Sequence, residues 1–347
     1  MPRLQANRIE KIAADLLHGA GAPAEEAAIV ARHSVAANLA GHDSHGIIQI
    51  PTYIGRIEQG HIVPGAPIEI VSETATTTVV DGNWGFGYVV SEEAMKRTIA
   101  KADAHNVAAA TVYRQGHVGR VADYPLMAAE QGMIGLMTAD SGRGPKAVAP
   151  FGGRVARLGT NPISIAVPSD LEGPLYFDMA TAAAAGGKIR LARAREQQVP
   201  PGWLIDAEGR ATTDPAALDE GGALLPLGAD VGFKGTALSV MVEILSALLT
   251  GLGFGVEPTG RHNDGCFIAV FKVAAFRDLV TFKREVSEFA QYLKETPLAE
   301  GFSEVFYPGE LEHLRRVERL RDGVDVEDAT WARLLALGEK YGVHLAA

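Results

Sequence analysis

Cysteine is almost absent from this sequence, because Cys266 is the single one among 347 residues. An internal disulfide framework is therefore excluded. Cys266 lies in the apolar run 266–271, a setting that favours a buried structural thiol over a reactive nucleophile. We therefore expect no redox chemistry from this residue.

Long basic runs and long apolar spans are missing as well. The formal net charge is −10 and is spread along the chain, so that a nucleic acid would gain little from binding by counterion release. Residues 1–4 lead directly into a charged amphipathic segment, which argues against a signal peptide or a membrane span. We expect a cytoplasmic protein that binds neither nucleic acid nor membrane. A small anionic substrate would have to be held by local cations in a cleft.

The usual nucleotide-binding fingerprints are not found either. The chain has no G-x-x-x-x-G-K-[ST] segment, so phosphoryl-transfer chemistry has no support. The letters of the Rossmann fingerprint occur twice, but 19–24 follows a predicted helix, and the prolines in and after 142–147 oppose the helix that the motif requires. The second match still lies in a loop that leaves a strand. Its Ser141, Arg143 and Lys146 offer a hydroxyl and two cations, or form an ordinary solvated loop.

The hydrophobic pattern divides the chain into helical ends and a β-rich middle. With 47% apolar and 21% charged residues the composition is that of an ordinary globular protein, long enough for an enzyme. Expected strands cover 76–80, 107–112, 134–138, 163–167, 175–178 and 267–273. Expected helices cover 9–17, 23–38, a segment from near 91, 120–131, 236–249, 286–294, 311–320 and 331–341.

This alternation predicts an α/β fold with a mixed central sheet. We expect the helical N- and C-terminal segments to pack together, because each has one apolar stripe to bury. The predicted division is a helical domain of residues 1–67 plus 283–347 and an α/β region of 68–282, which would bind cofactor and substrate.

Two histidines lie in polar, glycine-flanked settings. His117 follows a predicted strand and precedes a helix, and ligands usually bind at the carboxyl ends of strands in such sheets. His45 lies in the cluster 41–46. An imidazole can give or take a proton near pH 7, as the interconversion of a hydroxyl and a carbonyl requires. Each histidine also fits an ordinary hydrogen-bonded loop residue.

A metal-dependent hydrolase is an alternative from another class. His42, Asp43 and His45 would then be metal ligands, with His117 completing the site. Neighbouring residues rarely converge on one ion without a tight turn, and the chain has no H-E-x-x-H motif. The metal hypothesis is therefore the weaker of the two.

Over nearly its whole length the sequence resembles the malate/L-lactate dehydrogenase family of non-Rossmann oxidoreductases, which includes broad-specificity hydroxycarboxylate dehydrogenases, ureidoglycolate dehydrogenase and diketogulonate reductase. The resemblance rests on separated motifs in a common order: Gly41-His42-Asp43-Ser44-His45-Gly46 with Pro51 and Tyr53, Gly116-His117, Pro150-Phe151-Gly152-Gly153, Gly159-Thr160-Asn161-Pro162, Phe177-Asp178-Met179-Ala180-Thr181, Gly187-Lys188, Lys234-Gly235 and Tyr307-Pro308-Gly309. It implies the family's fold and a homodimer. It also implies hydride transfer between a nicotinamide cofactor and a small 2-hydroxy or 2-oxo acid, or reduction of a cyclic imine-2-carboxylate.

Carried over by residue, the resemblance makes His117 or His45 the proton donor and acceptor, with His117 favoured. Substrate contacts would come from Ser44, Gln49 and Tyr53. Cofactor contacts would come from Ser141, Asp178, Met179, Ala180, Phe233, Lys234, Gly309, Glu310 and Leu311.

Two details bear on specificity. Several family members have arginine where this chain has Gln49, and an amide does not replace a bidentate guanidinium. Arg120, Arg143 or Lys146 would then have to supply the positive charge for a substrate carboxylate. Acidic side chains such as Glu310 would repel a 2′-phosphate, which favours NAD over NADP.

Overall fold

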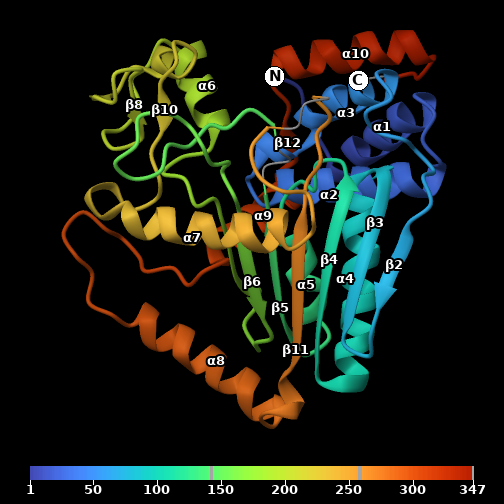
Figure 1. Ribbon diagram of the computed structural model, residues 1–347, viewed down its shortest axis with the longest axis vertical. Helices are drawn as coiled ribbons and strands as arrows, with labels where there is room; N and C mark the ends of the chain where they lie inside the picture. Colours follow the sequence, from blue (N-terminus) through green and yellow to red (C-terminus); the bar gives the residue numbers. More distant parts are fainter. Residues whose placement is uncertain (141–143, 257–259, 346–347) are drawn as a thin grey trace.

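The computed structural model describes residues 1–140, 144–256 and 260–345. Its centre is a seven-stranded sheet with strand order β2-β3-β4-β11-β5-β6-β7. Only β3 and β4 run parallel, and every other pair is antiparallel, so the sheet is mixed as predicted (Figure 1). The strands are β2 (Glu69–Glu73), β3 (Thr77–Gly85), β4 (Val107–Gln115), β5 (Met133–Ala139), β6 (Ile163–Val167), β7 (Leu175–Met179) and β11 (Cys266–Lys272).

Strand β11 enters the middle of this sheet from far along the sequence. It pairs antiparallel with β4 on one side and β5 on the other. Cys266, Ile268 and Val270 alternate along it and are fully buried, which confirms the structural thiol. Because β11 runs against β4, its first residues lie beside the last residues of β4, where His117 follows.

Two helices cover one face of the sheet. Helix α4 (Gly87–His105) is the crossover between the parallel strands β3 and β4, and α5 (Asp123–Ala129) packs on β5 and β6. The helix predicted over 120–131 is shorter, because residues 116–120 form an irregular segment with Gly119 at a φ of 71°. This irregular segment presents His117.

The helical ends pack together as predicted. Helix α10 contacts α1 and α3, α9 contacts α2, and the short strand β1 (Arg3–Leu4) pairs with β12 (Val324–Asp325). The helices are α1 (Ala6–Gly19), α2 (Ala24–Leu39), α3 (Ile50–Glu58), α9 (Glu310–Asp322) and α10 (Asp328–Tyr341). The predicted helix 286–294 forms the second half of α8 (Leu279–Lys294), which lies apart from these helices at the other end of the sheet (Figure 1).

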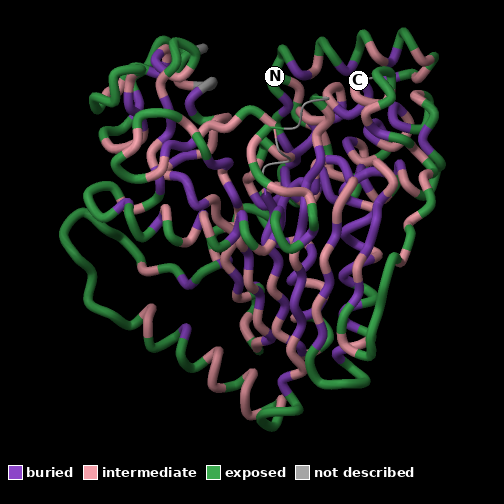
Figure 2. Tube along the Cα trace, viewed as in Figure 1, coloured by how far each residue is buried: buried purple, intermediate pink, exposed green. Residues whose placement is uncertain are grey.

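A smaller unit follows β7 and was not predicted. It contains α6 (Gly186–Ala194) and the two-residue strands β8 (Leu204–Ile205), β9 (Ala211–Thr212) and β10 (Ala223–Leu224), too short for a periodic signal. Helix α7 (Phe233–Glu243) leads back toward the main sheet and ends in a π-helical turn, Ile244–Leu248. Buried residues follow the main sheet and the N-terminal helices (Figure 2). None of the helices within the described ranges is long and apolar enough to cross a membrane.

Candidate active site

His117 lies directly beyond the carboxyl end of β4, as predicted, and its ring is anchored from behind. Its Nδ1 lies 2.8 Å from the hydroxyl oxygen of Tyr53 on α3, and that oxygen lies 3.0 Å from the hydroxyl of Tyr88 on α4. Both tyrosines are buried. The hydroxyl of Tyr53, a residue predicted to contact substrate, therefore lies between His117 and Tyr88.

A close approach of α4 fixes the backbone at His117. A Cβ on Gly87 would lie 2.2 Å from the carbonyl oxygen of Gly116 and 2.6 Å from that of His117. Only glycine leaves room for this contact. The first turn of α4 thus sets both the backbone and, through Tyr88, the side chain of His117.

His45 faces His117 from the cluster between α2 and α3. Asn38 shapes this turn: its Oδ1 accepts the N–H of Ile47 at 2.8 Å, and a Cβ on Gly46 would lie 2.2 Å from the same oxygen. The rings of His45 and His117 are stacked with centroids 5.6 Å apart. The two histidines named from the sequence therefore share one site.

Ser44 and Gln49 belong to the same turn. The Oγ of Ser44 lies 3.0 Å from Nδ1 of His45, and the Nε2 of Gln49 donates to the carbonyl oxygen of Ser44 at 2.7 Å. Ser44 is exposed, whereas Gln49 is half-buried. Gln49 thus braces the backbone that carries Ser44 and His45.

Both imidazoles are neutral at physiological pH. Burial lowers the pKa of His117 to about 3, and burial together with the charges of His42 and Arg120 lowers the pKa of His45 to about 4. A neutral imidazole has one donor and one acceptor nitrogen. When Tyr53 donates to Nδ1, Nε2 of His117 carries the proton; when Tyr53 accepts, Nε2 is free to take one.

A third histidine, which sequence reasoning missed, completes this group. The ring of His262 meets His117 edge to face, with centroids 5.6 Å apart. Its Nε2 lies 2.7 Å from Oδ1 of Asp264, and the other carboxylate oxygen accepts the N–H of Val118 at 3.0 Å. His262 and Asp264 lie just before β11. They reach the site because β11 pairs with β4, and this long-range pairing could not be predicted from the sequence.

Most of the predicted cofactor segments adjoin β7 and α7. Met179 ends β7, and the Leu227 N–H donates to Thr181 just beyond it at 2.9 Å. A Cβ on Gly235 in the first turn of α7 would lie 2.1 Å from the Leu227 carbonyl oxygen. Leu227 therefore joins the segment after β7, which includes Ala180, to the start of α7.

At the start of α7, Phe233 and Lys234 are exposed. The free amides of a helix N-terminus and a neighbouring ammonium suit the phosphates of a dinucleotide. Asp178 is held differently: its Oδ2 accepts the N–H of Ala122 at 2.9 Å, and burial raises its pKa.

The turn at Gly309 lies against the beginning of β7. Gly309 has a φ of 95°, and its missing Cβ would lie 2.5 Å from the carbonyl oxygen of Pro174. Glu310 pairs with Lys294 and accepts the N–H of Tyr307 at 3.1 Å, so that its carboxylate already caps this turn. Its neighbour Leu311 is exposed, and Ser141 lies outside the described residues.

Comparison with known proteins identifies the family. A family profile described as malate/L-lactate dehydrogenase matches residues 4–335. The chain belongs to the malate/L-lactate dehydrogenase family. It is 36% identical over 348 residues to L-sulfolactate dehydrogenase of Methanocaldococcus jannaschii, covering 99% of this chain and 98% of that protein.

Solved structures of family members share the fold. The malate dehydrogenase of Entamoeba histolytica superposes with a TM-score of 0.95 at 32% identity, covering 100% of this chain and 99% of that one. The Δ1-piperideine-2-carboxylate reductase of Pseudomonas syringae superposes with a TM-score of 0.85 at 28% identity, covering 97% and 100%. Similarity thus extends to members named for hydroxy acids and for a cyclic imine acid.

The cations expected to replace the missing family arginine are engaged elsewhere. Arg120 is buried and paired with Asp123, and the Lys146 ammonium, on a side chain that is 6% exposed, lies 3.1 Å from Glu243. Arg143 lies outside the described residues. Either cation could bind a substrate carboxylate only if its ion pair inside the protein were broken.

Arg120 is part of a buried network that sequence reasoning missed. Its partner Asp123 lies 3.1 Å from Nδ1 of His33, whose Nε2 lies 2.7 Å from Glu92. The pKa of His33 is raised, because its bonds to these two carboxylates outweigh burial. The network ties α2, α4 and α5 together beneath the site.

The proposed metal ligands point in different directions. His42 lies 3.6 Å from Glu312 on α9, Asp43 pairs with Arg319, and His45 faces His117. Across the described ranges no three histidine, cysteine, aspartate or glutamate side chains are arranged to hold a metal ion. The hydrolase alternative therefore has no ligand set among these residues.

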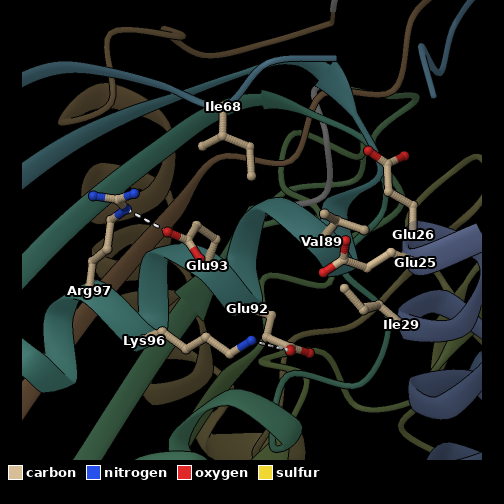
Figure 3. A pocket seen from close by; sticks show the side chains of 9 residues that line it. All are labelled: Glu25, Glu26, Ile29, Ile68, Val89, Glu92, Glu93, Lys96 and Arg97. Atoms are coloured by element: carbon tan, nitrogen blue, oxygen red, sulfur yellow. Dashed lines mark ion pairs between the residues drawn. The ribbon is translucent and has the colours of Figure 1, made fainter. Parts of the chain in front are cut away.

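A separate pocket of about 350 Å³ opens on the protein surface, and none of these histidines lines it. It lies between α2 and α4, and Figure 3 shows its charged side chains paired along α4: Glu92 with Lys96 and Glu93 with Arg97. The pair of Glu93 and Arg97 is typical of a solvated helix surface, whereas the Glu92 carboxylate is buried and also contacts His33. We do not assign the active site there.

Proposed function

We propose that this protein transfers a hydride between a nicotinamide cofactor and the α-carbon of a small 2-hydroxy or 2-oxo carboxylic acid. The observation that carries the proposal is His117, neutral and anchored through Nδ1 by Tyr53. Such a group can exchange the hydroxyl proton through Nε2. Membership of a family named for malate and lactate dehydrogenases supplies the reaction class.

His117 and its neighbours would share the work at the substrate oxygen. In the reducing direction, protonated His117 donates the proton on Nε2 to the carbonyl oxygen while the carbon receives the hydride. The ring is then neutral, and its remaining N–H on Nδ1 donates to the hydroxyl oxygen of Tyr53. Ser44 and His45, on the opposite side, would orient or polarise that oxygen.

A bound nicotinamide dinucleotide supplies or accepts the hydride. We assign its polar contacts to Lys234 and the free amides at the start of α7, and to the Asp178–Ala180 and Gly309–Leu311 segments. NAD is the preferred cofactor in this proposal, because Glu310 and Glu312 place negative charge near the Gly309 turn. Glu310 would act through this charge, since its oxygens already cap the turn.

We also infer a homodimer. Large apolar side chains are exposed along α8 and the segment after it, among them Val280, Tyr292 and Phe302. Exposed large apolar side chains that follow one another on a folded chain often mark association surfaces. Light scattering of the purified protein tests this, and a monomeric mass at micromolar concentration would contradict it.

The second candidate is reduction of a cyclic imine-2-carboxylate. The structural similarity to the Pseudomonas syringae reductase supports it, and the imine nitrogen would take its proton from the same histidine. One assay separates the candidates. Absorbance at 340 nm is followed while NADH or NADPH is offered with pyruvate, oxaloacetate, 2-oxoglutarate, phenylpyruvate and a cyclic imine acid. Consumption with an oxo acid supports the dehydrogenase, and consumption with the imine alone supports the reductase.

A further inference from the structure

His117 has two routes by which a proton could leave it. Nδ1 faces Tyr53, and Tyr53 faces Tyr88, but both hydroxyls are enclosed: the tyrosines are each 1% exposed. Burial raises the pKa of both phenols, so neither releases a proton to solvent. The hydrogen-bonded pair of Tyr53 and Tyr88 can therefore select the tautomer of His117, but it gives the proton no path to solvent.

The other side of His117 is occupied by His262. Its ring edge meets the His117 ring at a centroid distance of 5.6 Å and an interplanar angle of 74°. The His262 side chain is 21% exposed, whereas the Asp264 side chain beside it is 3% exposed. His262 therefore touches both the reacting histidine and solvent.

Asp264 holds His262 in one orientation. Its Oδ2 accepts the Val118 N–H at 3.0 Å, and the backbone N–H of Asp264 donates to the carbonyl oxygen of Gln115 at 3.2 Å. These bonds fix the carboxylate at the end of β4 and leave Oδ1 at 2.7 Å from Nε2 of His262. A carboxylate at this distance from a histidine ring stabilises the imidazolium form and so helps the ring to carry a proton.

Asp264 is the negative charge of this group. The His262 side chain and the N–H of Val118, which together outweigh burial, lower the pKa of Asp264, so that the carboxylate is ionised. Burial and the charges of His45, His262 and Arg56 lower the pKa of His117. The charge of Asp264 acts in the opposite direction and raises it. Asp140, the other carboxyl group nearby, has its pKa raised to about 8 by burial and by Asp264, and is neutral at pH 7.

We propose that His262, held by Asp264, is the proton carrier that connects His117 with solvent; this role rests on the proposed function. During oxidation of a 2-hydroxy acid, the hydroxyl proton moves to Nε2 of His117 as the hydride passes to the oxidised nicotinamide. The imidazolium of His117 gives a proton to the His262 ring, directly or through one water. His262 then releases it to solvent. The sum is one oxo acid, one reduced nicotinamide and one proton; reduction runs the same path backwards.

The test compares the wild-type protein with His262→Ala and His262→Gln, and with His105→Gln as a matched control. His105 is exposed in the last turn of α4, outside the site. For each protein kcat and KM are measured across pH, in water and in D2O, and with increasing imidazole in the buffer.

We expect both His262 variants to lower kcat about 10-fold or more, with KM for the acid changed less than about twofold. Imidazole should restore most of the lost kcat in the alanine variant, because it fits the space and carries a proton. The D2O effect on kcat should be larger in the variants than in the wild type. The control should match the wild type.

Three results would overturn the relay. A kcat within about twofold of wild type in both variants shows that His262 carries no proton that limits turnover. Retention of kcat by glutamine alone, or a loss without imidazole rescue, shows a structural role. A raised KM at constant kcat makes His262 a substrate contact. If the wild type itself consumes neither cofactor with any acid, the proposed function fails, and the relay with it.

Discussion

The hydroxyl of Tyr53 lies 2.8 Å from Nδ1 of His117, although the two residues are 64 positions apart in sequence. This contact joins the helical N-terminal layer to the end of β4. It turns a buried imidazole into a group with a defined donor and acceptor.

Replacing Tyr53 by phenylalanine removes the hydroxyl that selects the tautomer of His117. We expect kcat to fall about 10-fold, as for loss of other orienting partners of a catalytic histidine, with little change in KM. Steady-state kinetics measure this. Tyr341→Phe is the control, because Tyr341 lies on α10 and its hydroxyl donates to Glu58, away from the site. Equal activity of the Tyr53 and Tyr341 variants would contradict the orienting role.

Gly235→Ala places a Cβ 2.1 Å from the Leu227 carbonyl oxygen, so the start of α7 must move. We expect the free energy of unfolding to fall by about 1–3 kcal/mol, and the Kd for NADH to rise. Gly55→Ala is the matched control: its Cβ would meet nothing within 4 Å, and α3 should gain about 0.5–1 kcal/mol. Denaturant titration and NADH fluorescence measure both effects. Unchanged NADH binding by a folded Gly235 variant would count against a cofactor site at α7.

Gln49→Arg introduces the guanidinium that several family members carry at this position. Beside Ser44 and His45 it should bind a substrate carboxylate, and we expect KM for 2-oxo acids to fall about 10-fold. Gln59→Arg adds the same charge at the exposed end of α3 and should leave KM unchanged. If both variants lower KM equally, the effect is one of net charge and not of position.

Part of this candidate site could be predicted from the sequence. His117 and His45 were singled out because both lie in polar, glycine-flanked settings, and the structure brings their rings together. The role of Tyr53 as a substrate contact came from the family resemblance, and helical periodicity could not show that its hydroxyl bonds His117. His262 and Asp264 were missed because their position depends on a long-range antiparallel pairing of β11 with β4.

For the fold as well, the elements with a local sequence pattern were predicted, and those without one were missed. The strands of the main sheet have alternating or continuous apolar patterns and were largely predicted, whereas β8, β9 and β10 have two residues each and were not. The His33 network was invisible for a related reason. Its members come from three helices, and nothing in a helical pattern shows that a buried polar residue has distant carboxylate partners.

Asp140 predicts how stability depends on pH. Burial raises the pKa of its carboxyl to about 8, above the ordinary value of 3.8. Between about pH 4 and 8 the folded protein therefore keeps a proton that the unfolded chain has lost, and this group makes the free energy of unfolding fall as pH rises. The expected slope is up to about 1.4 kcal/mol per pH unit.

Asp140→Asn should remove this slope. The amide oxygen can still accept the N–H of Gly265, which bonds Asp140 Oδ1 at 2.7 Å. We expect the variant to gain stability relative to wild type as pH rises from 5 to about 8, measured by urea unfolding at each pH. Asp230→Asn, at an exposed position, is the control. A constant difference between wild type and the Asp140 variant across this range would show that Asp140 is ionised throughout.

The most direct test of the central claim is turnover by His117→Ala beside the wild type, followed at 340 nm with the cofactor and acid that the wild type prefers. We predict that the wild type oxidises NADH with a 2-oxo acid and that the variant loses about 100-fold or more in kcat while still binding NADH. An unchanged kcat in the variant would contradict the assignment and move the acid-base role to His45.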